Sequence, residues 1–102
     1  MLKHCVFVNF QSQHTQAARD AILGGFAQIA SDVPGMVDYC FGNNLDFENM
    51  SPDFQNGFIV TFTDRDAHLA YETHPKHIAM GAQLVSMCEG GVKGIIVFDL
   101  KV

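Results

Sequence analysis

Four short segments of the chain are rich in apolar and β-branched residues and are bounded by polar or turn-forming residues, which predicts four β-strands. The segments are residues 2–10, 36–42, 58–62 and 92–102. Successive side chains of a strand point to opposite faces of a sheet, so alternate residues share a face. The intervening stretch 43–57 is polar, with Ser51-Pro52-Asp53 at its centre, which predicts a surface loop between the second and third strands.

Apolar residues recur every three or four positions in the remaining segments, as they do in amphipathic helices. Residues 15–33 carry them at Ala18, Ile22, Phe26, Ile29 and Val33, and Pro34-Gly35 ends this helix. A shorter helix is predicted from Thr63 or Asp64, either of which caps it, to about residue 74. A third begins at Pro75, because proline is tolerated in the first turn of a helix but not inside one, and ends at Gly90-Gly91.

The predicted order of elements is therefore β-α-β-β-α-β, with the second helix divided at Pro75. This order is typical of the ferredoxin-like α+β fold, in which helices cover one face of a four-stranded antiparallel sheet. The chain has 102 residues, too few for two hydrophobic cores, so residues 1–102 are expected to form a single domain.

Both faces of the predicted sheet carry apolar side chains. Cys5 and Phe7 oppose Val6 and Val8 on the first strand, and on the last strand Ile96, Phe98 and Leu100 oppose Ile95 and Val97. Helices can cover only one face, and an antiparallel sheet normally places polar residues on a wet face. Burying four large side chains contributes roughly 6–12 kcal/mol. We therefore expect a second copy to pack its sheet against this one, giving a homodimeric α+β barrel.

Charge and composition argue against two classes of partner. The net charge is −5 and the six lysines and arginines are scattered, so nucleic acid binding is not expected. No apolar run approaches the ~20 residues needed to cross a bilayer, and the N-terminus lacks the apolar region of a signal peptide. Cys5, Cys40 and Cys88 are odd in number and widely spaced. They are expected to be buried, reduced thiols of a cytoplasmic protein.

The segment His74-Pro75-Lys76-His77, three residues after Tyr71, contains the clearest candidates for chemistry. Tyr71 ends one predicted helix and His77 begins the next, so the break at Pro75 is expected to direct both toward a common region. A phenol donates a proton and an imidazole titrates near neutrality. In a dry pocket the pair is suited to acid–base chemistry.

A carboxylate on the last strand completes this candidate site. Asp99 shares a strand face with Ile95 and Val97 and needs a buried partner, so we expect it to hydrogen-bond His77 and fix the imidazole tautomer. His4 faces the same way as Val6 and is either a core residue or a pocket residue. The other histidines are expected outside the pocket: His14 and His68 exposed to solvent, and His74 in the last turn of its helix.

No metal site and no cofactor are expected. His74 and His77 have a spacing seen in zinc sites, but Pro75 interrupts the helix that would align them, and no third ligand follows at a suitable distance. A hard cation held by backbone carbonyls leaves no signature in a sequence and stays open.

Several of these elements together resemble the stress-responsive α/β-barrel domain (Dabb) family, over essentially the whole chain. They are Lys3-His4-x-Val6-x-Val8-x-Phe10, Pro34-Gly35 followed by Gly42, Phe62, Tyr71 with His74-Pro75-x-His77, and Phe98-Asp99. The resemblance implies a ferredoxin-like protomer that dimerises through its sheets into a barrel. Most members of the family have no assigned biochemical role. Some plant members resemble each other and are polyketide cyclases, which act on a linear poly-β-ketone without a cofactor.

The resemblance also implies roles for individual residues. His77 and Tyr71 take the places of the catalytic pair, His4 that of a pocket histidine, and Asp99 that of the carboxylate orienting the catalytic histidine. Phe26 stands where cyclising members have a second tyrosine, so this chain lacks one pocket hydroxyl. The ligand-binding wall is expected to consist of Val6, Val8, Ile22, Phe26, Phe58, Met80 and Gly81.

Three functions compete on these observations. The first is a cofactor-independent lyase or isomerase, similar to the polyketide cyclases, with His77 as base and Tyr71 as hydrogen-bond donor. The second is a non-catalytic dimeric module that binds a small apolar molecule or protects under stress. The third is a cofactor-independent monooxygenase of the same architecture; those enzymes resemble one another in using a tryptophan, and this chain has none. A pocket of ~300 Å³ or more beside His77 and Tyr71 favours a ligand-binding role over a filled interior.

Overall fold

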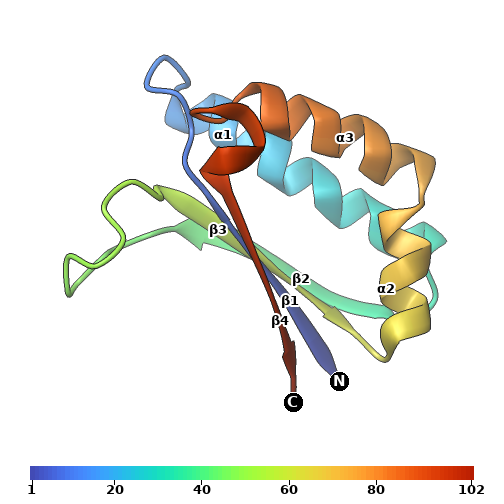
Figure 1. The fold of residues 1–102 in the computed structure, drawn as a ribbon. Helices are drawn as coiled ribbons and strands as arrows, with labels where there is room; N and C mark the ends of the chain where they lie inside the picture. The colour runs from blue at the N-terminus through green and yellow to red at the C-terminus, as the bar shows by residue number, and fades with distance from the viewer.

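The computed structural model describes residues 1–102 and contains one four-stranded antiparallel sheet with helices on one face (Figure 1). The strands are β1 (Leu2–Val8), β2 (Met36–Asn43), β3 (Asn56–Phe62) and β4 (Ile95–Lys101), in the spatial order β2-β3-β1-β4. The helices are α1 (Gln16–Gly25), α2 (Arg65–Glu72) and α3 (Pro75–Ser86). The ferredoxin-like α+β fold predicted from the sequence is confirmed.

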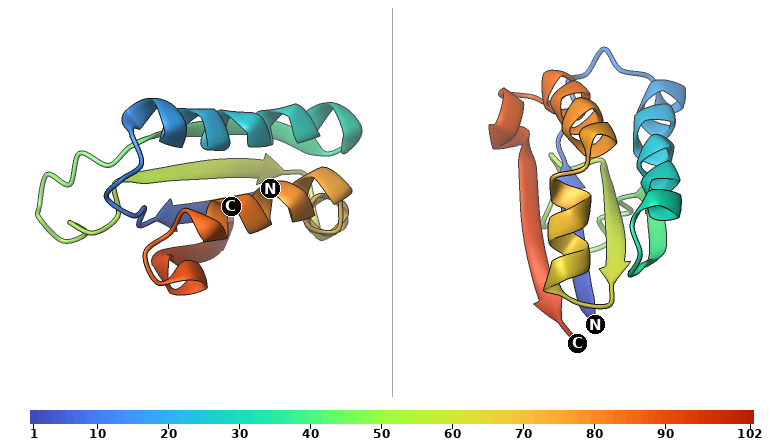
Figure 2. Two further views of the ribbon diagram at one scale, coloured as in Figure 1. Left: turned by 90° about the horizontal axis from the view of Figure 1, so that it is seen from above. Right: turned by 90° about the vertical axis from the view of Figure 1, so that its right-hand side faces the viewer.

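The helices form a single layer over the sheet, as the two views of Figure 2 show. α1 and α3 lie side by side along the sheet, and α2 crosses one end of it. None of the three has the length and apolar character that crossing a bilayer requires. The opposite face of the sheet has no helix on it.

The first predicted helix differs from the observed one. The α-helix ends at Gly25, and Phe26–Asp32 continues as a 3-10 helix (η1) instead of extending α1 to residue 33. A Cβ added at Gly25 would overlap the terminal methyl of Met80 on α3. Gly25 therefore permits the close approach of the two helices, and the chain tightens directly after it.

The predicted strands also differ at their ends. Residues Gly91–Gly94 form a 3-10 turn (η2), so the last strand begins at Ile95 rather than at residue 92. The third strand begins at Asn56, two residues before the predicted start at residue 58. The backbone of Asn56 pairs with Asn43 at the end of β2, and its side-chain amide donates to the Asn43 side chain.

Side chains cap all three helices at their N-termini. The Thr15 hydroxyl accepts from the Ala18 N–H at 3.1 Å, and the Asp64 carboxylate accepts from the Ala67 N–H at 2.9 Å. The third cap corrects a prediction, because His74 does not lie in the last turn of α2. His74 precedes Pro75 as the N-cap of α3, and its Nδ1 accepts from the Lys76 N–H at 3.1 Å.

The hydrophobic core lies between the sheet and the helix layer and contains 17 buried residues. Even-numbered residues of β1 and β3 face the helices, as the register His4↔Val60, Val6↔Phe58 and Val8↔Asn56 shows. Phe26 stacks on Phe58 with ring centroids 5.2 Å apart and closes the core toward η1.

The outer face of the sheet carries exposed apolar side chains, as the two-faced strand pattern predicts. Phe7, Ile59, Ile96, Phe98 and Leu100 are between 36% and 56% exposed. An open hollow of about 600 Å³ lies at the end of this face, beside the loop between β2 and β3. A lone protomer therefore presents much of its apolar surface to water.

Candidate functional site

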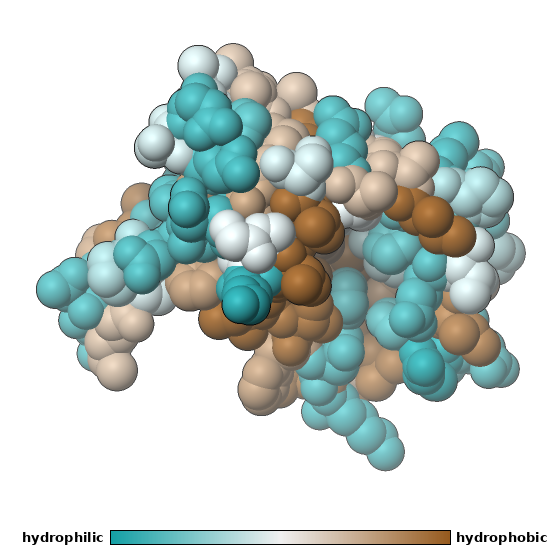
Figure 3. All heavy atoms as spheres, turned by 45° about the horizontal axis from the view of Figure 1, so that its top comes forward, coloured by the Kyte–Doolittle hydropathy of each residue, from teal (hydrophilic) through white to brown (hydrophobic).

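A pocket of about 360 Å³ lies between the sheet and helices α2 and α3. It opens past β4: Figure 3 shows hydrophobic side chains gathered in the middle of this side of the molecule, with a hollow between them and the hydrophilic side chains around α2. The larger hollow on the outer face contains no histidine or acidic residue. Of the two, only the smaller, inner pocket is lined by histidine, tyrosine and acidic side chains.

All four residues predicted to be catalytic line this pocket: His4, Tyr71, His77 and Asp99. Of the predicted wall, Val6, Phe26, Phe58 and Gly81 line it as well. Three others do not reach it. Val8 and Ile22 are buried in the core, and Met80 packs at the edge of the core against Gly25.

Tyr71 and His77 meet in the pocket because the chain bends between two helices. Tyr71 lies in the last turn of α2 and His77 in the first turn of α3, and their ring centroids are 4.3 Å apart. Pro75 imposes this bend, as expected from the sequence.

The imidazole of His77 is oriented by a backbone group. Its Nδ1 lies 3.0 Å from the carbonyl oxygen of Glu72 at the end of α2. A carbonyl only accepts, so the Nδ1–H donates to it and Nε2 is the unprotonated nitrogen of the neutral ring. Burial lowers the pKa of His77, so the ring is neutral at neutral pH and its Nε2 is able to accept a proton.

The hydroxyl of Tyr71 is buried and has no hydrogen-bond partner within the chain. The residue is 1% exposed, and burial raises the pKa of its phenol. The group therefore remains a protonated donor. Leaving such a donor unpaired costs about 1–3 kcal/mol, so an oxygen atom of a ligand in the pocket would satisfy it.

The predicted hydrogen bond between Asp99 and His77 is wrong. His4 Nδ1 donates instead to Asp99 Oδ1 at 2.6 Å. The two residues are direct cross-strand partners of β1 and β4, on the helix-facing side of the sheet. The Asp99 side chain is also 52% exposed rather than buried, because β4 is an edge strand. Adjacent strands place the carboxylate beside His4, and the Glu72 carbonyl takes over the orientation of His77.

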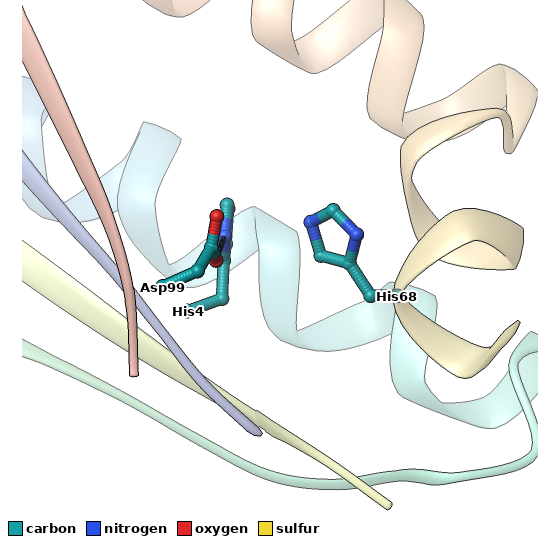
Figure 4. Close-up of side chains that lie close together, drawn as sticks. All are labelled: His4, His68 and Asp99. Atoms are coloured by element: carbon teal, nitrogen blue, oxygen red, sulfur yellow. Dashed lines mark hydrogen bonds and ion pairs between the residues drawn. The ribbon is translucent and has the colours of Figure 1, made fainter. Parts of the chain in front are cut away.

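His68 was predicted to be exposed, and the structure corrects this. Its side chain is only 14% exposed, and its ring centroid lies 4.9 Å from that of His4 (Figure 4). Burial lowers the pKa of His68. A helical spacing of three residues from Tyr71 is the sequence signal that places His68 on the same face of α2.

His14 is likewise half-buried rather than exposed, against Phe10 and outside the pocket. Its Nε2 is buried without a partner.

Comparison with known proteins identifies relatives of the whole chain. The family model described as "Stress responsive A/B Barrel Domain" matches residues 2–102. A stress-response A/B barrel domain-containing protein of Arabidopsis thaliana is 26% identical over 101 residues, which are 98% of this chain and 85% of that protein.

Two solved structures have the same fold. A dimeric ferredoxin-like protein of unknown function from Jannaschia sp. CCS1 is 38% identical with a TM-score of 0.86, covering 99% of this chain and 98% of the other. The hydroxynitrile lyase of Passiflora edulis is 20% identical with a TM-score of 0.83, covering 99% and 92% respectively. The second likeness concerns the fold alone.

Proposed function

The chain belongs to the stress-responsive A/B barrel domain family, and from that premise we propose that it is a cofactor-independent acid–base enzyme of the lyase or isomerase type. Its substrate would carry an acidic carbon next to a carbonyl group and an apolar tail. The observation that supports this most directly is the unpaired, buried hydroxyl of Tyr71 beside the neutral imidazole of His77 in a 360 Å³ pocket.

In this mechanism His77 is the base. Its Nε2 takes the proton from the carbon next to the carbonyl; the electron pair of the broken C–H bond forms a C=C bond, and the π pair of the carbonyl moves onto its oxygen to give an enolate. The Nδ1–H of the resulting imidazolium remains hydrogen-bonded to the Glu72 carbonyl. The same proton then returns from Nε2 to another atom of the substrate, which completes an isomerisation, an addition or an elimination.

Tyr71 stabilises the charge that develops during this step. Its phenol donates to the forming enolate oxygen, and its raised pKa keeps the proton on the phenol while it does so. The hydroxyl has no partner within the chain, so no existing hydrogen bond has to break before it donates. His4 also lines the pocket, and Asp99 holds its imidazole in place by accepting the Nδ1–H.

The remaining walls determine which substrates fit. Phe26, stacked on Phe58, lines the pocket with a ring that has no hydroxyl. This favours an apolar tail over the longer poly-β-ketone of the cyclising relatives. That a hydroxynitrile lyase has the same fold is compatible with carbon-acid chemistry here.

We further propose that the protein is a homodimer joined through the outer faces of the two sheets. The exposed apolar side chains of that face and the dimeric state of the Jannaschia relative support this arrangement. The inner pocket lies on the other side of each sheet, so dimerisation would leave it open.

The test uses a β-ketoamide that has an alkyl tail. NMR in D₂O measures the rate at which its carbon-bound proton is exchanged for deuterium. We expect the parent protein to accelerate exchange and His77→Ala to reduce the rate by about 10²–10⁴-fold, the range of positioned acid–base catalysis. His74→Asn is the matched control, because it removes a neighbouring imidazole while keeping a good N-cap on α3.

Equal exchange rates in His77→Ala and the parent would remove His77 from the mechanism. Binding of the ketoamide without any acceleration would favour the second function, a non-catalytic module that holds a small apolar molecule. Titration of the ketoamide by calorimetry separates these outcomes.

A further inference from the structure

We propose that His4, His68 and Asp99 form a binding site for a first-row transition-metal ion of the zinc type at the mouth of the pocket. One ligand atom of each residue lies within 4.8 Å of those of the other two. The three come from β1, α2 and β4, and Figure 4 shows their heads directed toward one another.

The donor set fits such an ion. Two imidazoles and one carboxylate are the protein ligands of many catalytic zinc sites, which leave further positions open. Imidazole nitrogen favours zinc and its neighbours in the first row, whereas Mg²⁺ and Ca²⁺ prefer oxygen ligands. The open positions of an ion at this place would face the pocket that Tyr71 and His77 line.

The ligand atoms of the three residues would have to move only slightly to surround an ion. Ligand atoms around a tetrahedral ion lie roughly 3.4 Å apart, as follows from Zn–N and Zn–O distances of about 2.0–2.2 Å. His4 Nδ1 and Asp99 Oδ1 are 2.6 Å apart and share the proton of their hydrogen bond; an ion between them would replace this proton, which leaves to solvent, and the two heads would part slightly. A small rotation of the His68 side chain, which packs between the rings of His4 and Phe62, would close the remaining distance.

The contacts of His68 Nδ1 determine which ring nitrogen has the proton, and therefore whether Nε2 is free to bind the ion. Nδ1 touches the Arg65 guanidinium and lies 4.0 Å from the Glu72 carboxylate. Arg65 only donates, so its contact favours the tautomer that has the proton on Nε2. Glu72 accepts, so it favours the proton on Nδ1 and leaves Nε2 for the metal, as outer carboxylates do for metal-bound histidines. The Arg65 side chain is 65% exposed and is free to turn away.

This site differs from the one considered in the sequence. His74 is engaged as the N-cap of α3, and its Nε2 lies 3.3 Å from Asp32. His77 is engaged with the Glu72 carbonyl. Neither is a ligand here, so metal binding and the proposed action of His77 fail or succeed independently.

The test is calorimetric titration of the chelator-treated full chain with Zn²⁺, in a Cys40→Ser background because Cys40 is the exposed thiol. We expect one ion per protomer in the parent. His68→Leu and Asp99→Asn are each expected to weaken binding at least tenfold, since each removes one of three ligands. Leucine suits the partly apolar surroundings of His68 against Phe62, and asparagine keeps the shape of Asp99.

Two histidine variants serve as controls. His74→Asn and His77→Ala remove imidazoles of the same region that are not ligands, and both are expected to bind Zn²⁺ like the parent. Arg65→Met is expected to tighten binding, because it removes the donor that favours the blocking tautomer of His68. Circular dichroism of each variant verifies that it is folded.

The proposal is overturned if the parent binds no Zn²⁺, or if folded His68→Leu and Asp99→Asn bind it as tightly as the parent. An equal loss in His74→Asn would assign the binding to surface histidines instead. Weaker binding in Arg65→Met would contradict ligation through Nε2 of His68.

Discussion

At the residue scale, the site depends on polar groups that still have a free hydrogen-bonding atom after their contacts within the chain are made. His77 gives its Nδ1–H to the Glu72 carbonyl and keeps Nε2 for the pocket. Tyr71 has no partner for its hydroxyl at all. An unpaired donor beside an imidazole at the wall of a pocket favours a polar ligand there.

Replacing Tyr71 by phenylalanine separates its structural from its chemical role. Tyr71→Phe removes an unpaired buried hydroxyl, so we expect the free energy of unfolding to rise by about 1 kcal/mol. The exchange rate of the ketoamide is expected to fall by about 10²-fold, since one donor to the enolate is lost. Urea denaturation and NMR exchange measure the two effects. A loss of stability without a loss of rate would make Tyr71 a packing residue.

The pH dependence follows from His77. Burial lowers the pKa of His77 below its ordinary value of about 6.5, and the neutral ring is the form that takes the proton. The exchange rate should therefore be level at neutral pH and fall on the acid side, with a midpoint below pH 6.5. A pH–rate profile of the parent protein checks this. A midpoint above pH 6.5 would contradict the assignment of His77 as the base.

At the element scale, the break between α2 and α3 brings Tyr71 and His77 together. The end of α2 supplies the Glu72 carbonyl, and the start of α3 supplies His77. His74 and Pro75 fix where α3 begins: the imidazole caps the helix, and the proline ring presets the first turn.

The cap predicts a measurable contribution of His74 to stability. His74→Ala is expected to lower the free energy of unfolding by about 1 kcal/mol, because the Lys76 N–H loses its acceptor. His74→Asn should recover most of this, since asparagine is a good N-cap. Chemical denaturation of the two variants provides the comparison, and equal stabilities would mean that the cap contributes nothing.

At the scale of the whole molecule, the sheet separates two surfaces with different roles. The helix side holds the core and the pocket, and the outer side exposes large hydrophobic residues. A protein that remained monomeric would expose this outer face, whereas two copies joined there would bury it.

A charge on the outer face should prevent this association. Phe98→Glu places a carboxylate at the most exposed large side chain of the face and is expected to convert dimers into monomers at micromolar concentration. Val92→Glu, at an exposed position in η2 outside the sheet, is the control and should leave the dimer intact. Sedimentation velocity distinguishes the two. A parent protein that sediments as a monomer would refute the proposed sheet-to-sheet dimer.

The sequence by itself determined the strands, the helices and the meeting of Tyr71 with His77. These depend on local rules: alternation along strands, the three-to-four spacing of helices, and the restriction that Pro75 places on its own backbone. The two-faced apolar pattern of the strands is local in the same sense, and the exposed outer face agrees with it.

Only the tertiary structure decided which partner each titratable group has. Asp99 pairs with His4 rather than with His77 because β4 lies beside β1 in a register that sets these two residues opposite each other, 95 positions apart in the chain. Likewise, His68 enters the pocket because α2 crosses the end of the sheet above His4. Strand order, register and helix position arise from packing between distant segments, and no local pattern in the chain encodes them.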